Sequence, residues 1–129
     1  MDNKTKIRSA NKAVEVAKSL VADFDKEYVI GLYLNAENTV KKAEVIGIGT
    51  LTATLIHPRE VYKPAIRHSA AGLVLLHNHP TGGVKPSDAD IKVTKQMKKA
   101  GEILGIPLLD HIIFCRTSDY YSLKGNKKM

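Results

Sequence analysis

Residues 77–90, HNHPTGGVKPSDAD, place two histidines, a glycine-containing loop and the run Ser-Asp-Ala-Asp within one short stretch. On a strand, side chains alternate between the two faces, so His77 and His79 would point to one side and Asn78 to the other. The apolar residues 72–76 precede them and predict a buried strand. The histidines would then lie at the C-terminal end of a strand, where α/β proteins commonly place their sites. Two imidazoles converging there suit the binding of one metal ion.

A third ligand is expected from the segment that follows. Pro86 disfavours helix before it, and Ser87 is a good N-cap, so a helix is predicted to begin there. Asp90 would occupy the third helical position and face inward, three residues before Val93. A helix N-terminus favours an anion at this position. Two histidines and one carboxylate leave a coordination position open for water, the pattern of catalytic zinc.

A purely structural interpretation of the same residues is also available. Ser87-x-x-Asp90 is close to a capping box, which needs no metal. A pair of histidines one residue apart can simply end a strand. The combination of His77, His79 and Asp90, with Pro86 fixing the helix start, favours the metal site over either piece taken alone.

The elements that position these residues follow from apolar periodicity. A mixed sheet covered by helices, and therefore an α/β fold, is expected because strands alternate with helices. The predicted elements are a leading helix over residues 1–24, a buried strand at 28–34, a hairpin-paired strand at 40–49, a helix opening at 57–60 with Val61, Ala65 and Ile66 facing inward, the strand at 72–76, a helix from 87 to 104 with Val93, Met97, Ala100 and Leu104 facing inward, a strand at 108–114 and a short edge strand within 117–123.

The length and composition indicate one domain over residues 1–129, with 125–129 as a flexible basic tail. The single cysteine, Cys115, excludes an internal disulfide and a cysteine-rich zinc module, which suits a reducing cytoplasm. No signal segment or membrane-spanning run is recognisable. We therefore expect a cytoplasmic protein with no membrane partner.

The net charge of +7 is compatible with contact to nucleic acid. The densest group of lysines lies on the predicted third helix, at Lys92, Lys95, Lys98 and Lys99. A solvated helix face is the simpler interpretation. A weak DNA contact through Lys92, Lys95 and Lys99 is the alternative.

The motif as a whole resembles the JAB/JAMM (MPN+) metallopeptidase motif. It consists of His77-x-His79-Pro80, seven residues between His79 and Ser87, and then x-x-Asp90. The segments HNHPTGG, PSDAD, HPREV and LLDHIIF are similar to those of the RadC-like branch of that superfamily, over roughly residues 20–125. Many longer members of the branch carry an N-terminal helix-hairpin-helix segment, which this sequence lacks.

The resemblance implies a three-layer α/β/α architecture, like that of cytidine deaminases, and a zinc ion held by His77, His79 and Asp90. It implies Glu27, just before the first strand, as the general base, although the residues alone would place Glu27 as an exposed charge in a turn. Glu44 is the alternative base, but it lies within the second predicted strand. Ser87 would donate a hydrogen bond to the developing oxyanion in addition to capping the helix.

The implied activity is zinc-dependent hydrolysis of an amide or isopeptide bond in a peptide or protein. A zinc nucleobase deaminase is excluded because it would need P-C-x-x-C ligands. An HNH nuclease is disfavoured because Asn78 would face away from the two histidines. The remaining alternative is a non-catalytic module, associated with DNA repair, that binds nucleic acid or protein and keeps a metal site. Of the other histidines, His111 is interpreted as structural or as a support for the site, and His57 as a helix cap.

Overall fold

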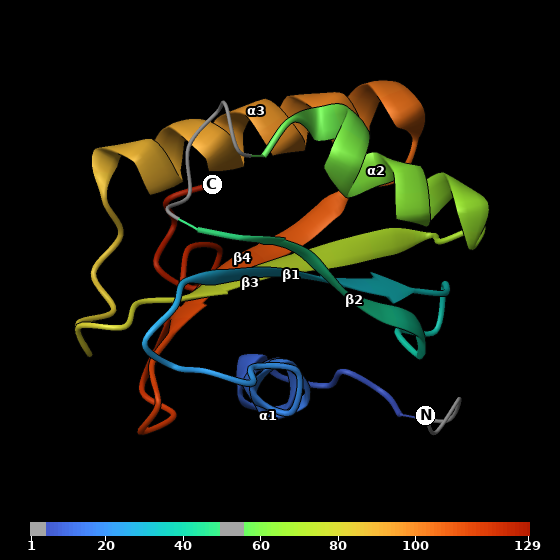
Figure 1. The fold of residues 1–129 in the computed structure, drawn as a ribbon. Helices are drawn as coiled ribbons and strands as arrows, with labels where there is room; N and C mark the ends of the chain where they lie inside the picture. Colours follow the sequence, from blue (N-terminus) through green and yellow to red (C-terminus); the bar gives the residue numbers. More distant parts are fainter. Residues whose placement is uncertain (1–4, 50–55) are drawn as a thin grey trace.

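The computed structural model describes residues 5–49 and 56–129. Its named strands form one sheet (Figure 1). The elements in chain order are α1 (Ala10–Lys18), β1 (Tyr28–Leu34), β2 (Val40–Ile48), α2 (Pro58–Arg67), β3 (Gly72–Asn78), α3 (Asp88–Leu104), β4 (Leu108–Phe114) and β5 (Tyr120–Ser122). Every residue of β1 and β3 is buried, as expected for near-continuous apolar strands. The sheet order is β2-β1-β3-β4-β5.

The sheet is mixed, as the sequence predicts. β1 pairs antiparallel with both β2 and β3, and β5 pairs antiparallel with β4. The pair of β3 and β4 is parallel. A parallel pair needs a crossover connection, and α3 supplies it. The crossover matters for function because it carries the start of α3 back toward the end of β3.

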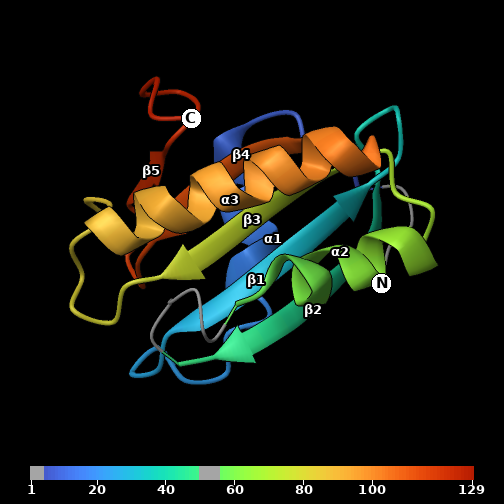
Figure 2. The ribbon, with the colours of Figure 1, turned by 90° about the horizontal axis from the view of Figure 1, so that it is seen from above.

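Helices cover both faces of the sheet (Figures 1 and 2). α1 packs on one face, against inward side chains such as Ile30 and Leu32. α2 and α3 pack on the other face, against Val29, Tyr33 and Leu75. The strand residues alternate between the two cores, which is the period-two pattern of a pleated strand. The α/β class and the mixed sheet are confirmed, whereas the closer likeness to cytidine deaminases stays a prediction.

Among the described residues, the leading helix expected over residues 1–24 spans only Ala10–Lys18, and residues 1–4 lie outside the described part of the chain. Ser9 caps α1 by accepting a hydrogen bond from the Lys12 amide, and the helix ends at Lys18. The Ser19 hydroxyl then donates to the Val16 carbonyl at 2.6 Å, and tight turns follow. Val21 and Phe24 still pack against the same core from these turns. The apolar stripe therefore continues beyond the helix, which is why periodicity overestimated its length.

Two inward positions were predicted wrongly. Ile66 is 60% exposed and Leu104 is 47% exposed. In α3 the buried position near the C-terminus is Gly101 instead. A Cβ at Gly101 would meet the Tyr62 hydroxyl and the Ile106 carbonyl, so the absent side chain allows α3 to approach its neighbours closely. At this end of α3 the residue that faces the core is therefore Gly101 and not Leu104.

Residues 125–129, expected as a flexible tail, are joined to the fold. The Lys128 amide donates to the Leu123 carbonyl at 2.7 Å, and the Asn126 amide donates to the Ser122 carbonyl at 3.1 Å. Met129 packs against the core beneath α2 and α3. Within residues 5–49 and 56–129, none of the helices has the length and apolar character that a bilayer crossing requires.

Candidate metal centre

The end of β3 places His77 and Asn78 on opposite faces, as strand alternation predicts. The His77 ring is fully buried on the face covered by α3. Asn78 is buried on the other face, where its Oδ1 accepts from the Tyr28 amide at 2.7 Å and its Nδ2 donates to the Lys26 carbonyl at 2.8 Å. Asn78 thereby holds the backbone on both sides of Glu27. No pattern in the sequence indicated this role for Asn78.

His79 lies just beyond β3, and its backbone amide donates to the Phe114 carbonyl at 2.9 Å. Its ring Nδ1 is 2.9 Å from the Gly83 carbonyl oxygen. A carbonyl can only accept, so Nδ1 carries a proton, and in the neutral ring Nε2 is the nitrogen with the lone pair. The loop reaches this position through Gly82, whose φ of 93° is in the left-handed region. The two glycines thus set the orientation of the His79 ring.

The start of α3 brings the carboxylate to the two rings. Ser87 and Asp90 form a complete capping box: the Asp90 amide donates to Ser87 Oγ at 3.0 Å, and the Ser87 amide donates to Asp90 Oδ2 at 2.8 Å. The same carboxylate lies 3.1 Å from His77 Nε2 through Oδ1 and 3.4 Å from His79 Nε2 through Oδ2. The capping interpretation and the metal interpretation are therefore compatible, because one carboxylate lies within reach of the Ser87 amide and of both rings.

The three groups form a triangle of suitable size for a metal ion. The two Nε2 atoms are 3.1 Å apart, and Asp90 oxygens lie 3.1 and 3.4 Å from them. Ligands about 2.0–2.1 Å from a tetrahedral zinc ion would be separated by roughly 3.3 Å. Two imidazole nitrogens and a carboxylate oxygen are also a common donor set for catalytic zinc. The residues present therefore fit the ion that the motif implies.

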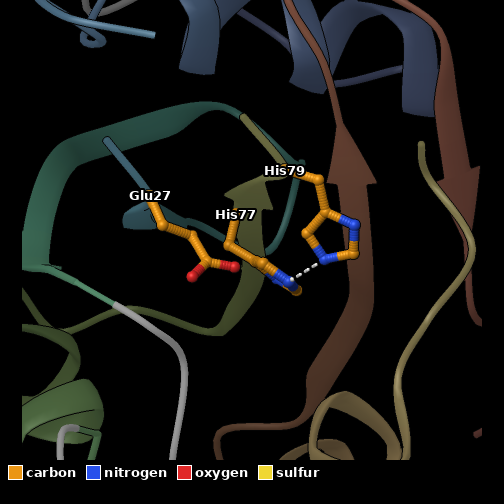
Figure 3. A group of neighbouring side chains, drawn as sticks. All are labelled: Glu27, His77 and His79. Carbon is orange, nitrogen blue, oxygen red and sulfur yellow. Dashed lines mark hydrogen bonds between the residues drawn. The ribbon is translucent and has the colours of Figure 1, made fainter. Parts of the chain in front are cut away.

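Glu27 approaches this group from the chain just before β1 (Figure 3). Glu27, His77 and His79 each offer one possible ligand atom, and these atoms lie within 4.8 Å of one another. Asp90 makes closer contacts with the rings and its side chain is only 3% exposed, whereas Glu27 is half-buried. Two carboxylates thus face the same pair of rings, and Asp90 is the better placed of the two to bind directly.

Charge and burial act together on the site. Burial alone would raise the pKa of Asp90, but the contacts of its carboxylate with the His77 and His79 rings outweigh burial and hold that pKa well below its usual range. The hydrogen bond to Asp90 raises the pKa of His79 above the ordinary imidazole value, against an opposing effect of burial. Without a metal, the carboxylate is therefore ionised and His79 retains a proton more readily than a free imidazole.

Two buried residues behind His77 complete the arrangement. His111 on β4 places Nε2 at 2.9 Å from His77 Nδ1, and Thr94 on α3 places Oγ1 at 2.5 Å from His111 Nδ1. Burial lowers the pKa of His111 well below its ordinary value, so the ring is neutral. The structure places His111 in contact with His77, as its interpretation as a support for the site requires. Thr94 was missed, and its position four residues after Asp90, on the same helix face, was the available signal.

The other residues singled out lie outside this group. Lys92, Lys95 and Lys99 are exposed on α3, as a solvated helix face would be. Glu44 pairs in register with Gly31 inside the hairpin of β1 and β2, whereas Glu27 lies at the strand end. Cys115 is buried, and the ring of His57 caps α2 by accepting from the Arg59 amide at 3.1 Å.

Comparison with known proteins assigns the family. The model of the RadC-like JAB domain matches residues 7–128. UPF0758 proteins are similar: that of Chlorobaculum tepidum is 47% identical over 94% of this chain and 54% of its own length. That of Methanococcoides burtonii is 46% identical over 95% of this chain and 53% of its own length, and that of Rubrobacter xylanophilus is 49% identical over 81% and 45%.

The chain spans about half the length of the curated relatives it matches. The family match covers nearly all of this chain, including β3, the glycine-containing loop and the start of α3. The chain belongs to the RadC-like JAB domain family.

Proposed function

We propose that this domain is a zinc-dependent hydrolase that cleaves an amide or isopeptide bond in a peptide or protein. The observation that carries the proposal is the triangle of His77 Nε2, His79 Nε2 and the Asp90 carboxylate, with the Glu27 carboxylate beside it. A site that only stabilised the fold would not need a second, half-exposed carboxylate facing the two rings.

His77, His79 and Asp90 would hold the ion. When bound, zinc supplies Lewis acidity, which acidifies a water molecule and polarises a carbonyl group. Three protein ligands leave a coordination position open for that chemistry. Asp90 would also neutralise part of the charge of the ion, and the hydrogen bond that its Oδ2 accepts from the Ser87 amide holds the carboxylate beside the rings.

Glu27 is proposed as the general base. It accepts a proton from the attacking water as the water oxygen bonds to the carbonyl carbon of the substrate. It then gives that proton to the nitrogen as the carbon–nitrogen bond breaks, so the products are a carboxylic acid and an amine. Asn78 supports this role because it fixes the backbone at Lys26 and Tyr28, on either side of Glu27.

Ser87 is proposed to stabilise the oxyanion that forms on the substrate carbonyl. Its Oγ accepts from the Asp90 amide at 3.0 Å, which leaves the hydroxyl proton free to be donated elsewhere. The residue is exposed at the start of α3, so a substrate can reach it. A donor aimed at developing charge commonly contributes about 10²–10³-fold in rate.

The experiment is a zinc-dependent hydrolysis screen with two matched glutamate variants. Wild type, Glu27→Gln and Glu44→Gln are tested on a quenched fluorescent peptide library and on fusions joined through a lysine isopeptide bond. Chelation should abolish hydrolysis and added zinc should restore it. Glu27→Gln should lose roughly 10²–10⁴-fold in rate while it still binds zinc, because it removes a proton acceptor and not a ligand.

Glu44→Gln is the control because it removes a carboxylate from the neighbouring strand and should keep the activity. Equal rates for wild type and Glu27→Gln, or loss confined to Glu44→Gln, would show that the base has been assigned to the wrong residue. Hydrolysis that survives complete removal of the metal would contradict the proposed function itself.

A further inference from the structure

A line of three buried hydrogen bonds runs from α3 through β4 to the ring of His77. The Thr94 hydroxyl donates to the Asp90 carbonyl at 2.7 Å, one turn earlier in α3. Thr94 Oγ1 also lies 2.5 Å from His111 Nδ1, and His111 Nε2 lies 2.9 Å from His77 Nδ1. Thr94, His111 and His77 are each fully buried, so no solvent enters these contacts.

The direction of each proton follows from the first of these bonds. A hydroxyl has one proton, and a carbonyl oxygen can only accept, so the Thr94 proton lies toward Asp90. Thr94 Oγ1 must therefore accept from His111, which places a proton on His111 Nδ1. The neighbours of the two His111 ring nitrogens are a hydroxyl and another imidazole, neither of which is a carboxylate that would hold a second proton. His111 Nε2 is then an acceptor, and His77 Nδ1 must donate to it.

We propose that Thr94 and His111 are positioning residues that fix the proton of His77 on Nδ1, so that the Nε2 lone pair faces the metal site before any metal arrives. The inference rests on the proposed function, because it assigns His77 Nε2 as a metal ligand. It adds a cause for that ligand's protonation state, which the coordinating residues alone do not supply.

The hydrogen-bonded pair of Thr94 and His111, called the relay below, is needed because the site itself favours the other tautomer of His77, with the proton on Nε2. His77 Nε2 lies 3.1 Å from Asp90 Oδ1, close enough for an Nε2–H group to donate to the carboxylate. That charge-assisted hydrogen bond would be a strong one, and it would place the proton on the nitrogen that must bind the metal. Partners behind metal-bound histidines commonly change metal affinity by about 10–100-fold. His111 contacts His77 from behind in this way, and Thr94 holds His111.

The test compares Thr94→Val with Thr94→Ser. Valine has a similar shape and no hydroxyl, whereas serine keeps the hydroxyl. Two measurements are made: zinc affinity, by competition with a chromophoric chelator, and the tautomer of His77, from the nitrogen chemical shifts of the metal-free protein at about pH 8.5, above the ordinary imidazole pKa.

The relay predicts that Thr94→Val loses about 10–100-fold in zinc affinity and moves the His77 proton to Nε2. Thr94→Ser should keep both wild-type properties. A Thr94→Val protein that melts at lower temperature but keeps the His77 proton on Nδ1 would show that Thr94 is merely structural, which overturns the proposal.

The wild-type spectrum tests the relay without any variant. A proton on Nε2 of His77 in the metal-free wild type would overturn the relay even if Thr94→Val failed to fold. The proposed function fails by a separate result, namely a wild-type protein that binds no zinc. Because the tautomer is measured without metal, the two failures can be told apart.

Discussion

Replacing Asp90 by asparagine should separate the two roles of this side chain, and Asp88 provides a matched control. Both residues are acidic and lie in the first turn of α3. Asp88 is exposed, whereas Asp90 is 2% exposed and contacts both histidine rings. Asp88→Asn and Asp90→Asn therefore remove the same charge from the same helix terminus, but only one of them changes the metal site.

In the metal-free protein, both variants should lose the interaction of a carboxylate with the helix N-terminus. That interaction contributes about 0.3–1 kcal/mol at an exposed position and up to about 2 kcal/mol when partly buried. In Asp90→Asn the amide oxygen of the new side chain can still accept from the Ser87 amide, so the cap is weakened rather than removed. We expect Asp88→Asn to lose less than about 1 kcal/mol and Asp90→Asn about 1–2 kcal/mol.

Zinc should then distinguish the two variants clearly. At a zinc concentration about 100 times the dissociation constant, binding to the folded state adds roughly 2.7 kcal/mol of stability. A domain of this size gains roughly 4 °C in melting temperature for each kcal/mol. Wild type and Asp88→Asn should therefore melt about 10 °C higher with zinc, whereas Asp90→Asn should show little change. The assay is thermal unfolding with zinc and with chelator.

An Asp90→Asn variant that gains the same melting temperature from zinc as wild type does would refute this assignment. The capping box would then be the whole role of Asp90, and Glu27 would become the third ligand, since it also lies near both rings.

Three further properties of the site can be measured. Because the pKa of His79 is raised, a proton must leave its ring before zinc binds, so the apparent zinc affinity should fall as the pH falls, by up to about tenfold per pH unit for each proton displaced. Calorimetry in buffers of different ionisation enthalpy measures the number of protons released on zinc binding. A zinc affinity that does not change from about pH 6 to 8 would contradict this prediction. Asn78→Ala should destabilise the fold by about 1–3 kcal/mol and slow hydrolysis without lowering the zinc content. The reason is that it leaves the Tyr28 amide unpaired and releases the backbone around Glu27. Loss of zinc from this variant would place Asn78 in the metal site instead. DNA binding should be weak, independent of DNA sequence and steeply dependent on salt concentration. It should vanish when the exposed residues Lys92, Lys95 and Lys99 are changed to glutamate. Tight DNA binding that survives these changes would favour the alternative function, a module that binds nucleic acid.

The proximity of His77, His79 and Asp90 could be predicted from the sequence because each link is local. Strand alternation orients the two histidines, and the proline–serine start fixes where Asp90 falls on α3. The nearness of Glu27 came from the resemblance to a family and not from its own surroundings. The position of Glu27 depends on contacts made by other strands. The Gly49 amide donates to the Glu27 carbonyl at 2.7 Å, and the Asn78 side chain holds the adjacent backbone.

The supporting contacts of the site could not be predicted in the same way. The bond between His111 and Thr94 joins β4 to α3 and depends on how the crossover packs over the sheet. The face that α3 presents to the core was misjudged at Leu104, because Gly101 lets the helix approach Tyr62. In both cases the deciding fact is a contact between distant segments, which a periodic pattern does not record.

The central claim is that two histidine nitrogens and a carboxylate oxygen hold zinc at the end of β3. X-ray absorption at the zinc edge, on protein loaded with one equivalent of zinc, tests it most directly. We predict a shell of about four nitrogen and oxygen neighbours near 2.0–2.1 Å, with outer scattering from two imidazoles that is lost in His77→Ala. Sulfur scattering near about 2.3 Å, or a spectrum identical in wild type and His77→Ala, would contradict it.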